Sequence, residues 1–374
     1  MNLTKIIRER LKLMSGGAQP SSNNNLLKDV RCEKNQCKEI GKGNFGMVYI
    51  GAYKENYDAD CYKRVALKVL SNKDKISIQE FEQEKEMAKR LKGNPNVVNF
   101  YGETTFPDDP TIRCLVFEYY ENGDLKKFLD PDPNPKDLDY NKKINILKQI
   151  CQGMAFIHEK KVLHRDLAAR NILLDKNLNA KVGDFGLAVL VENKNILEKE
   201  NELTQIPIRS MSPRFYKNNQ TFNIQTDLWA FGIIVWEIFT QDRINGIEIP
   251  VPYNNLKNEG VNILLANKKQ DLKYYTDTAF KTNNDFVNGI IKQCFEPAFA
   301  KQNNNNTSIN RTFTDLLEKI NEGPVPIYNT TGGSRKKKRT LKKGGRPKRR
   351  QSKKTRKATL EKYSIKHEKN YFNC

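Results

Sequence analysis

The chain has 374 residues, of which 37% are hydrophobic and 29% charged, enough for one large two-lobed domain or two ordinary ones. Its seven cysteines are scattered and include no Cys-x-x-Cys pair. This usage predicts neither a disulfide framework nor a zinc site and favours a reducing, intracellular compartment. The start resembles neither a secretory signal nor a myristoylation site, and the longest apolar run, within 228–239, is too short to span a bilayer.

The net charge of +21 is concentrated near the end of the sequence. Fifteen of the 65 Lys and Arg lie in 334–357, where there is no acidic residue and Leu341 is the one aliphatic side chain. Residues 323–374 are therefore expected to form a disordered basic tail. Its role stays open between a solvated extension, a nuclear-import signal, nucleic-acid binding and attachment to an anionic membrane surface. The stretch GGRPKRR resembles the Gly-Arg-Pro hook that enters the DNA minor groove.

Residues 1–35 are expected to form an N-terminal extension. Aliphatic residues recur there at helical spacing among basic ones, at Leu3, Ile6, Ile7 and Leu11. This pattern predicts a short helix that packs on the body or lies on a membrane surface. Residues 15–25, SGGAQPSSNNN, have the composition of a flexible break.

Residues 36–322 read as one α+β domain with two lobes. Up to about residue 118 the sequence shows short β-type runs (GMVYIGAY, RVALKVL, RCLVFEY) and one charged helical stretch at 77–92. Beyond about residue 124, long helical patterns dominate. We expect a small β-rich lobe at 36–118, a connection at 118–123 and a larger, mainly helical lobe at 124–322.

The first chemical motif is IGKGNFGMVY, whose glycines are Gly41, Gly43 and Gly46. Glycines leave the tip of a hairpin without side chains, so that backbone N–H groups can approach phosphates closely. A Gly-rich stretch by itself is more often an ordinary turn. The β-type residues on both sides favour a strand–turn–strand and disfavour a dinucleotide-binding Rossmann motif.

The run VALKVL predicts a strand with Val65, Leu67 and Val69 on one face and Ala66 and Lys68 on the other. Farther along, Glu84 lies in a helical stretch whose inner side would carry Phe81, Met87 and Leu91. An inward Glu84 would pair with Lys68 and hold its ammonium group on phosphates. The alternative is a lattice of surface ion pairs along a highly charged helix.

Residues 164–171 read HRDLAARN, and DFG follows at 184–186. Asp166, Asn171 and Asp184 would lie on two loops that flank a strand pair. Asn171 and Asp184 offer the oxygen ligands that Mg²⁺ prefers, and Asp166 would accept a hydroxyl proton. Phosphoryl transfer needs such positioning and charge neutralisation more than covalent help.

Together these motifs resemble those of the protein kinases, over roughly three-quarters of the chain. The resemblance implies a bilobal kinase fold with ATP as phosphate donor and Mg²⁺ or Mn²⁺ as cofactor. It implies Asp166 as catalytic base with Arg170 beside it, Lys68 on the α/β phosphates paired with Glu84, and metal ligation by Asn171 and Asp184. The remaining nucleotide contacts would be Gly41, Gly43, Gly46, Val48, Ala66, Glu118, Tyr120, Asp124 and Leu173. Phe117 would form the back wall of the adenine pocket, and Asp227 would anchor the catalytic loop.

The loop resembles the tyrosine-kinase variant in particular. Serine/threonine kinases usually carry Lys two residues after the catalytic Asp, where this chain has Ala168. Here the basic residue is Arg170, four residues after Asp166, and a tyrosine phenol reaches farther than a serine hydroxyl. IPIRSM at 206–211 resembles the tyrosine-kinase platform for the residue after the target. We expect an active tyrosine kinase acting on protein substrates. A serine/threonine or dual-specificity kinase and a nucleotide-binding pseudokinase scaffold remain alternatives.

Some positions depart from the family pattern. Ser210 stands where the family has Trp, and Ser212-Pro213-Arg214 replaces Ala-Pro-Glu. The lost Glu normally pairs with an Arg, here near Arg311, so that ion pair is expected to be absent and the platform less rigid. The Asn/Lys/Ile-rich body with its detached basic tail resembles proteins encoded by large DNA viruses of protists, which would place the protein in a host cell.

The segment between Asp184 and Pro213 contains no Tyr, so the usual activating phosphotyrosine is absent. Glu198, Glu200 and Glu202 could partly replace a loop phosphate near Arg165, because a carboxylate supplies part of a phosphate's charge. Activity without loop phosphorylation is therefore expected, with Thr204 as the alternative switch.

Overall fold

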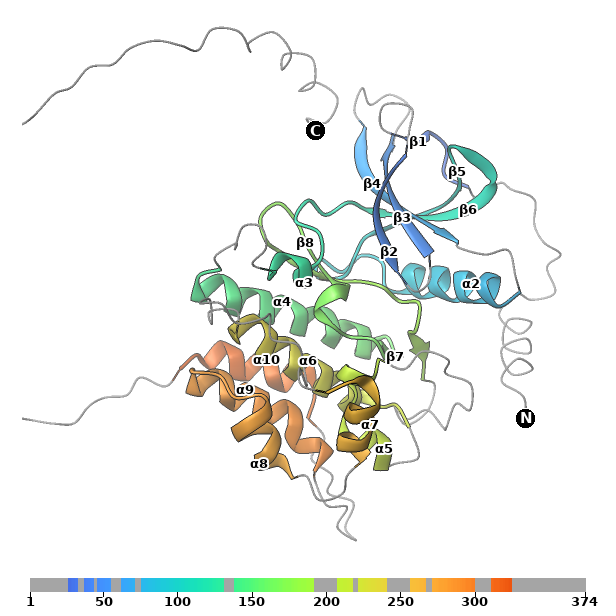
Figure 1. Ribbon diagram of the computed structural model, residues 1–374. Coiled ribbons are helices and arrows are strands. Elements are labelled where there is room, and N and C mark those ends of the chain that lie inside the picture. Colours follow the sequence, from blue (N-terminus) through green and yellow to red (C-terminus); the bar gives the residue numbers. More distant parts are fainter. Residues whose placement is uncertain are drawn as a thin grey trace, which may run out of the picture.

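The computed structural model describes residues 26–32, 37–43, 46–54, 62–70, 75–130, 138–191, 207–217, 221–240, 256–266, 271–299 and 311–324. These residues form an upper β-rich lobe and a lower helical lobe (Figure 1). The α+β, two-lobed architecture predicted from the sequence is confirmed. The N-terminal helix and the basic tail lie outside the described residues.

The N-lobe is built on a sheet of six strands in the order β1-β3-β4-β6-β5, with β2 also paired to β3. The strands are β1 (Val30–Cys32), β2 (Lys38–Gly43), β3 (Gly46–Tyr53), β4 (Lys63–Leu70), β5 (Phe100–Phe106) and β6 (Asp109–Glu118). The sheet thus begins at Val30, inside the range that the sequence assigns to the extension. On β4 the predicted alternation is present, with Val65, Leu67 and Val69 buried on one face.

The charged helical stretch forms α2 (Lys75–Arg90), which lies beside the lower edge of the sheet (Figure 1). Its inner side carries Phe81, Met87 and Glu84, all buried, as the sequence predicts; the predicted inner residue Leu91, just past the end of the helix, is buried too. A glutamate buried in a helix of this charge density needs a partner, because an unpaired buried carboxylate is costly. Glu84 is therefore expected to pair with a cationic side chain from another element of the lobe.

The expectation of no disulfide is wrong, because Cys32 and Cys37 are bonded to each other. β1 and β2 pair with successive parts of β3, so the disulfide joins the two halves of one sheet edge. Asp108, in the turn before β6, accepts a hydrogen bond from the Cys37 N–H at 3.3 Å. The sequence spacing did not reveal this pair, since it depends on both strands sharing the neighbour β3.

The C-lobe is a packed set of helices around α6 (Ile224–Thr240), thirteen of whose residues are buried. The other helices are α3 (Leu125–Phe128), α4 (Tyr140–Glu159), α5 (Pro213–Lys217), α7 (Asn258–Ala266), α8 (Leu272–Tyr274), α9 (Asp285–Phe295) and α10 (Phe313–Glu322). Asp139, Asn284 and Thr312 cap the N-termini of α4, α9 and α10 through their side chains. A helix that is apolar all round, such as α6, is buried at the centre of its lobe.

Two short strand pairs lie at the top of the C-lobe, β7 (Val162–Leu163) with β10 (Val189–Leu190) and β8 (Ile172–Leu174) with β9 (Ala180–Val182). The segment that follows α2 joins this layer directly. The Val98 N–H donates to Val182 O at 2.9 Å, and the Val182 N–H donates to Asn96 O at 2.8 Å. Residues 96–98 thus lie within the N-lobe part of the sequence, but their backbone is hydrogen-bonded to β9 of the C-lobe.

Within the described ranges, no helix combines the length and the apolar character needed to cross a membrane.

Candidate active site

The predicted pairing of Lys68 with Glu84 is present. The Lys68 Nζ lies 2.6 Å from Glu84 Oε1 and 3.0 Å from Asp184 Oδ1. Burial alone would lower the pKa of Lys68, but Asp184 and Glu84 raise it overall, so the lysine stays protonated. Burial likewise opposes ionisation of Asp184, but Lys68 lowers the pKa of that carboxyl below its usual range. A fixed cation therefore faces the space between the lobes.

The catalytic loop presents Asp166 between two donors. Arg170 donates to Asp166 Oδ1, and Asn171 Nδ2 donates to Asp166 Oδ2 at 2.8 Å. The short 3-10 helix η2 (Ala169–Asn171) brings both donors back toward the aspartate. Asp166 is 6% exposed, so its carboxylate is held in one orientation. An oriented carboxylate of this kind can position a hydroxyl and accept its proton.

Asp227 of α6 fixes the backbone of this loop from below, as the sequence predicts. Its carboxylate accepts the N–H groups of His164 and Arg165, each at 3.0 Å, and lies 2.9 Å from His158 Nε2. Burial would raise the pKa of Asp227, but the contacts with His158 and His164 lower it overall. Arg165 has the left-handed φ of 65°, a strained conformation that such anchoring maintains.

The predicted metal ligands, Asn171 and Asp184, each offer an oxygen atom of suitable chemistry. The Asn171 Nδ2 group donates to Asp166 O and Asp166 Oδ2, which leaves the amide oxygen as the ligand atom. Asp184 offers a carboxylate oxygen from the loop after β9, where it has a φ of 61° and the next residue, Phe185, is buried. An amide oxygen and a carboxylate are hard ligands that fit Mg²⁺ or Mn²⁺.

The Gly-rich stretch forms the β2–β3 hairpin, as predicted. Gly43 pairs with Gly46, whose φ of 146° favours glycine, while residues 44–45 are outside the described part. Val48 pairs with Lys68, and Ala66 lies one alternation away on the same face of β4. These residues therefore line one side of the space above the catalytic loop.

The connection between the lobes contains the predicted hinge residues. The Glu118 N–H donates to Asn99 O at 2.9 Å, so its carbonyl is the backbone group that can contact a base. Tyr120 turns its phenol inward, where it accepts from the Asn99 N–H, and burial raises its pKa. Phe117 packs against Phe100 with ring centroids 5.2 Å apart.

Asp124 and Leu173 lie at the floor of the connection, where they form an isolated backbone bridge. The Asp124 carboxylate accepts from the Lys127 N–H at 2.9 Å and so caps α3. This helix-capping role accounts for the aspartate without any ligand, and its predicted nucleotide contact stays a proposal. Leu173 is half-buried on β8.

The platform after the predicted activation loop is anchored differently from the family pattern. Arg214 does not replace the missing glutamate in an ion pair; it donates to Pro297 O at 2.6 Å. Arg311 lies 3.6 Å from Glu296 Oε2 instead. Both guanidinium groups thus bind the short 3-10 helix η5 (Glu296–Ala298). The missing ion pair was predicted, but its replacement by a shared anchor was not.

Within the described residues, Arg165 contacts a backbone carbonyl and an aromatic ring. Its Nε donates to Leu187 O at 2.6 Å, and its guanidinium lies 5.1 Å from the centre of the Phe222 ring. The predicted partners Glu198, Glu200 and Glu202 and the alternative switch Thr204 lie outside the described residues.

Sequence reasoning missed several residues that hold the site together. Gln83 Nε2 donates to Ala188 O at 2.7 Å and so ties α2 to the segment after Asp184. Glu103 and Arg113 bind the outer side of α2 from β5 and β6. No spacing rule connects these strand residues to α2, because their partners are set by how the helix docks.

A β-rich lobe with a Gly-rich hairpin and a Lys–Glu pair, above a helical lobe that carries an anchored Asp–Arg–Asn loop, is the arrangement of a protein kinase domain. The family model described as "Protein tyrosine and serine/threonine kinase" matches residues 35–305, and the chain belongs to that family.

Three similar curated proteins are named as a growth factor receptor, a tyrosine-protein kinase receptor and a cytoplasmic tyrosine-protein kinase. The chain is 34% identical over 227 residues to the NT-3 growth factor receptor of Sus scrofa, covering 55% of this chain and 26% of that protein. It is 32% identical over 233 residues to the tyrosine-protein kinase receptor svh-2 of Caenorhabditis elegans, covering 62% and 19%. It is 33% identical over 220 residues to the human cytoplasmic tyrosine-protein kinase BMX, covering 59% and 30%. The chain thus spans less than a third of the length of these relatives.

Proposed function

We propose that the protein transfers the γ-phosphate of ATP to tyrosine hydroxyls of protein substrates. The observation that carries this proposal is the position of Arg170, which binds the Asp166 carboxylate from four residues farther along the loop. Position 168, where a serine/threonine kinase would place its lysine, is a buried alanine. A cation set back in this way leaves room for a phenol to approach Asp166.

In this proposal each described group has one task. Lys68, held by Glu84, binds the phosphates of ATP, and the β2–β3 hairpin covers them with backbone N–H groups. Asp166 orients the phenol and accepts its proton as the oxygen attacks phosphorus. Asn171 and Asp184 would hold Mg²⁺ or Mn²⁺, which supplies charge neutralisation on the phosphates. Glu118 and Tyr120 would contact adenine through the backbone, with Val48, Ala66 and Leu173 packed on its ring.

The test is phosphoamino-acid analysis of the purified chain with ATP and Mg²⁺. A Glu/Tyr polymer and a serine- and threonine-rich basic protein serve as the two substrates. Phosphotyrosine alone is the expected product. Phosphoserine or phosphothreonine as the main product would show a serine/threonine or dual-specificity enzyme, and absence of ATP turnover would show a pseudokinase scaffold.

Arg170→Gln sharpens the test, because it removes the set-back cation and leaves Asp166 in place. We expect the rate on the tyrosine polymer to fall by about tenfold to a hundredfold. The matched control is Lys92→Gln, at an exposed position in the turn after α2. Equal rates for the two variants would contradict the role of Arg170 in choosing tyrosine.

We also propose 36–322 as the catalytic domain and an intracellular site of action. The supporting observations are that one relative is named as a cytoplasmic kinase and that Cys114, Cys151 and Cys294 are free and buried. The Cys32–Cys37 disulfide weighs against a strictly reducing environment.

A further inference from the structure

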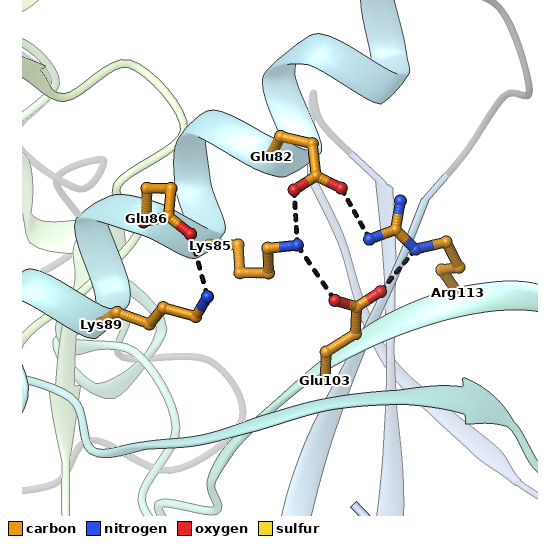
Figure 2. A network of polar contacts seen from close by, with 6 residues as sticks. All are labelled: Glu82, Lys85, Glu86, Lys89, Glu103 and Arg113. Atoms are coloured by element: carbon orange, nitrogen blue, oxygen red, sulfur yellow. Dashed lines mark hydrogen bonds and ion pairs between the residues drawn. The ribbon is translucent and has the colours of Figure 1, made fainter. Parts of the chain in front are cut away.

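Helix α2 is bound to the sheet by a closed ring of four charged side chains (Figure 2). Lys85 lies 2.5 Å from Glu82 and 3.1 Å from Glu103, and Arg113 lies 2.6 Å from Glu82 and 2.5 Å from Glu103. Two members come from α2, one from β5 and one from β6. We call Glu82, Lys85, Glu103 and Arg113 the charged ring. Each of its members contacts two residues of opposite sign.

The charged ring differs from an ordinary surface ion pair. The side chains of Lys85 and Glu103 are only 12% and 15% exposed, so solvent screens them less than an exposed pair. Burial would raise the pKa of Glu103, but hydrogen bonds from Arg113 and Lys85 lower it overall. The Arg113 guanidinium also lies 4.6 Å from the centre of the Phe81 ring on α2. Arg113 and Glu103 are therefore fixed points of the sheet to which α2 is attached.

The apolar packing of α2 is divided between two lobes. Phe81 and Ala88 belong to a small buried cluster with Phe100 and Leu115 of the sheet. Met87, and Leu91 just past the end of the helix, belong instead to the main core of the C-lobe. Apolar packing therefore leaves the upper part of the helix attached to the sheet through only a few side chains.

The C-terminal end of α2 is hydrogen-bonded to the C-lobe. Arg90 Nε donates to Lys160 O at 3.2 Å. Glu84 lies six residues before Arg90, about 9 Å along the helix axis. A rotation of about 20° about this end would move Glu84 by on the order of 3 Å, enough to break its 2.6 Å contact with Lys68. The charged ring lies on the same part of the helix as Glu84.

We propose that the charged ring is a positioning device, which holds α2 against β5 and β6 so that Glu84 stays on Lys68 without a phosphate on the activation loop. This inference rests on the proposed role of Lys68 in ATP binding. The ring residues touch neither substrate nor metal in this scheme. They act through Glu84 by setting the fraction of molecules in which the Lys68–Glu84 contact is closed.

The test compares Glu103→Lys with Glu86→Lys. Glu103→Lys turns both of its attractive contacts into repulsions, and we expect kcat to fall by about tenfold with KM for ATP changed less than about twofold. Among the residues that the structure describes, Glu86 pairs only with the exposed Lys89 on the same helix (Figure 2). Glu86→Lys is therefore the matched control, with kcat expected within about twofold of the parent.

Two further variants separate positioning from simple loss of stability. The inversion Glu82→Lys/Lys85→Glu/Glu103→Lys/Arg113→Glu restores an opposite charge at every contact, and it should return kcat to within about threefold of the parent. In a Glu84→Gln background, adding Glu103→Lys should lower kcat less than about twofold further, because the contact that the ring supports is already lost. An undiminished tenfold loss in that background would mean that the ring acts in another way.

Hydrogen exchange of the α2 amides gives a readout that needs no catalysis. Glu103→Lys should speed exchange across residues 75–85 while the amides of α6 keep their protection, and Glu86→Lys should leave both unchanged. Unchanged exchange together with unchanged kcat would overturn the proposal. If the parent protein fails to phosphorylate tyrosine, the proposed function falls, and the exchange comparison still decides whether the ring holds α2.

Discussion

The two lobes hold two carboxylates of the candidate site, Asp166 and Glu84, by opposite means. In the C-lobe, Asp166 lies on a loop whose backbone is bonded to Asp227, a 1% exposed residue of the central helix α6. In the N-lobe, Glu84 lies on a helix that is attached to its sheet through a small apolar cluster and the charged ring. The position of Asp166 is therefore fixed by the buried core of the C-lobe. The position of Glu84 depends on the partly exposed ion pairs of the charged ring. Substitutions in the C-lobe should change the rate of the chemical step or the stability of the fold. Those around α2 should change the fraction of molecules in which the Lys68–Glu84 contact is closed.

Asp166→Asn gives the largest expected effect on the C-lobe side. It keeps the shape of the side chain and removes the proton acceptor, so the rate of transfer should fall by about 10²–10⁴-fold. ATP affinity, measured by calorimetry, should stay nearly unchanged, because Asp166 orients the acceptor. The control is Asp271→Asn, the exposed cap of α8. Activity within tenfold of the parent would refute the assignment of Asp166.

Lys68→Met tests the N-lobe side of the comparison. Loss of the ammonium should lower kcat by about 10²-fold, more than it lowers ATP affinity. Lys89→Met is the matched substitution at a solvent-exposed position of α2 and should leave kcat unchanged. If Lys68→Met unfolds the protein in a thermal melt, the residue is structural.

A methyl group added to a glycine probes how tightly the chain is packed at that position. At Gly153 on α4, a Cβ would lie 2.6 Å from Asn96 O, whereas at Gly41 it would meet nothing within 4 Å. Gly153→Ala should lower the free energy of unfolding by about 1–3 kcal/mol, and Gly41→Ala by less than about 1 kcal/mol, as measured by urea denaturation. Equal losses would contradict the difference in packing between these two positions.

The pH dependence of stability at Glu237 on α6 tests whether water is excluded from the core of the C-lobe. Burial raises its pKa from the ordinary 4.5 to about 7, with partial opposition from Lys126 and Arg170. The neutral form is favoured in the folded state, so its stabilising effect is present below pH 4.5 and is lost as pH rises to about 7. The difference in unfolding free energy between Glu237→Gln and the parent should therefore shift by about 1–3 kcal/mol in favour of the variant as pH rises from 4.5 to about 7. A pH-independent difference would show that Glu237 is solvated.

Deletion of residues 334–374 should have the smallest effect, because no kinase motif lies there. Peptide phosphorylation should remain within about twofold of the parent. If the tail binds nucleic acid, affinity of the full chain for duplex DNA should fall steeply with the logarithm of salt concentration. DNA affinity that does not depend on salt concentration, or no DNA binding at low salt, would exclude the nucleic-acid role. Binding to vesicles of anionic lipid would instead favour attachment to an anionic membrane surface.

The sequence predicted the fold and the pairing of Lys68 with Glu84 because the evidence for both is local. Strand alternation placed Lys68 opposite Val65, Leu67 and Val69, and helical spacing placed Glu84 inward. Residue spacing alone allowed two interpretations of Glu84: it could pair with Lys68 on the sheet, or it could belong to a set of surface ion pairs along the helix. Both turn out to exist side by side, since Glu86 and Lys89 do form an exposed pair on the same helix.

The features that escaped prediction all depend on contacts between distant segments. Cys32 and Cys37 come together because β1 and β2 share β3 as neighbour. Glu103 joins the charged ring because α2 docks against β5. Arg214 and Arg311 bind η5 because the platform lies beside the end of α9. In each case the partner is chosen by three-dimensional packing, which residue spacing does not encode.

The backbone bonds of Val98 and Val182 bear on how the chain folds. An N-terminal fragment ending at residue 118 would carry the N–H of Val98 and the carbonyl of Asn96 without their partner on β9. We therefore expect the two lobes to melt in a single cooperative transition rather than as separable domains. Refolding of the sheet should then wait for the β8–β9 hairpin, even though that hairpin is made later in the chain.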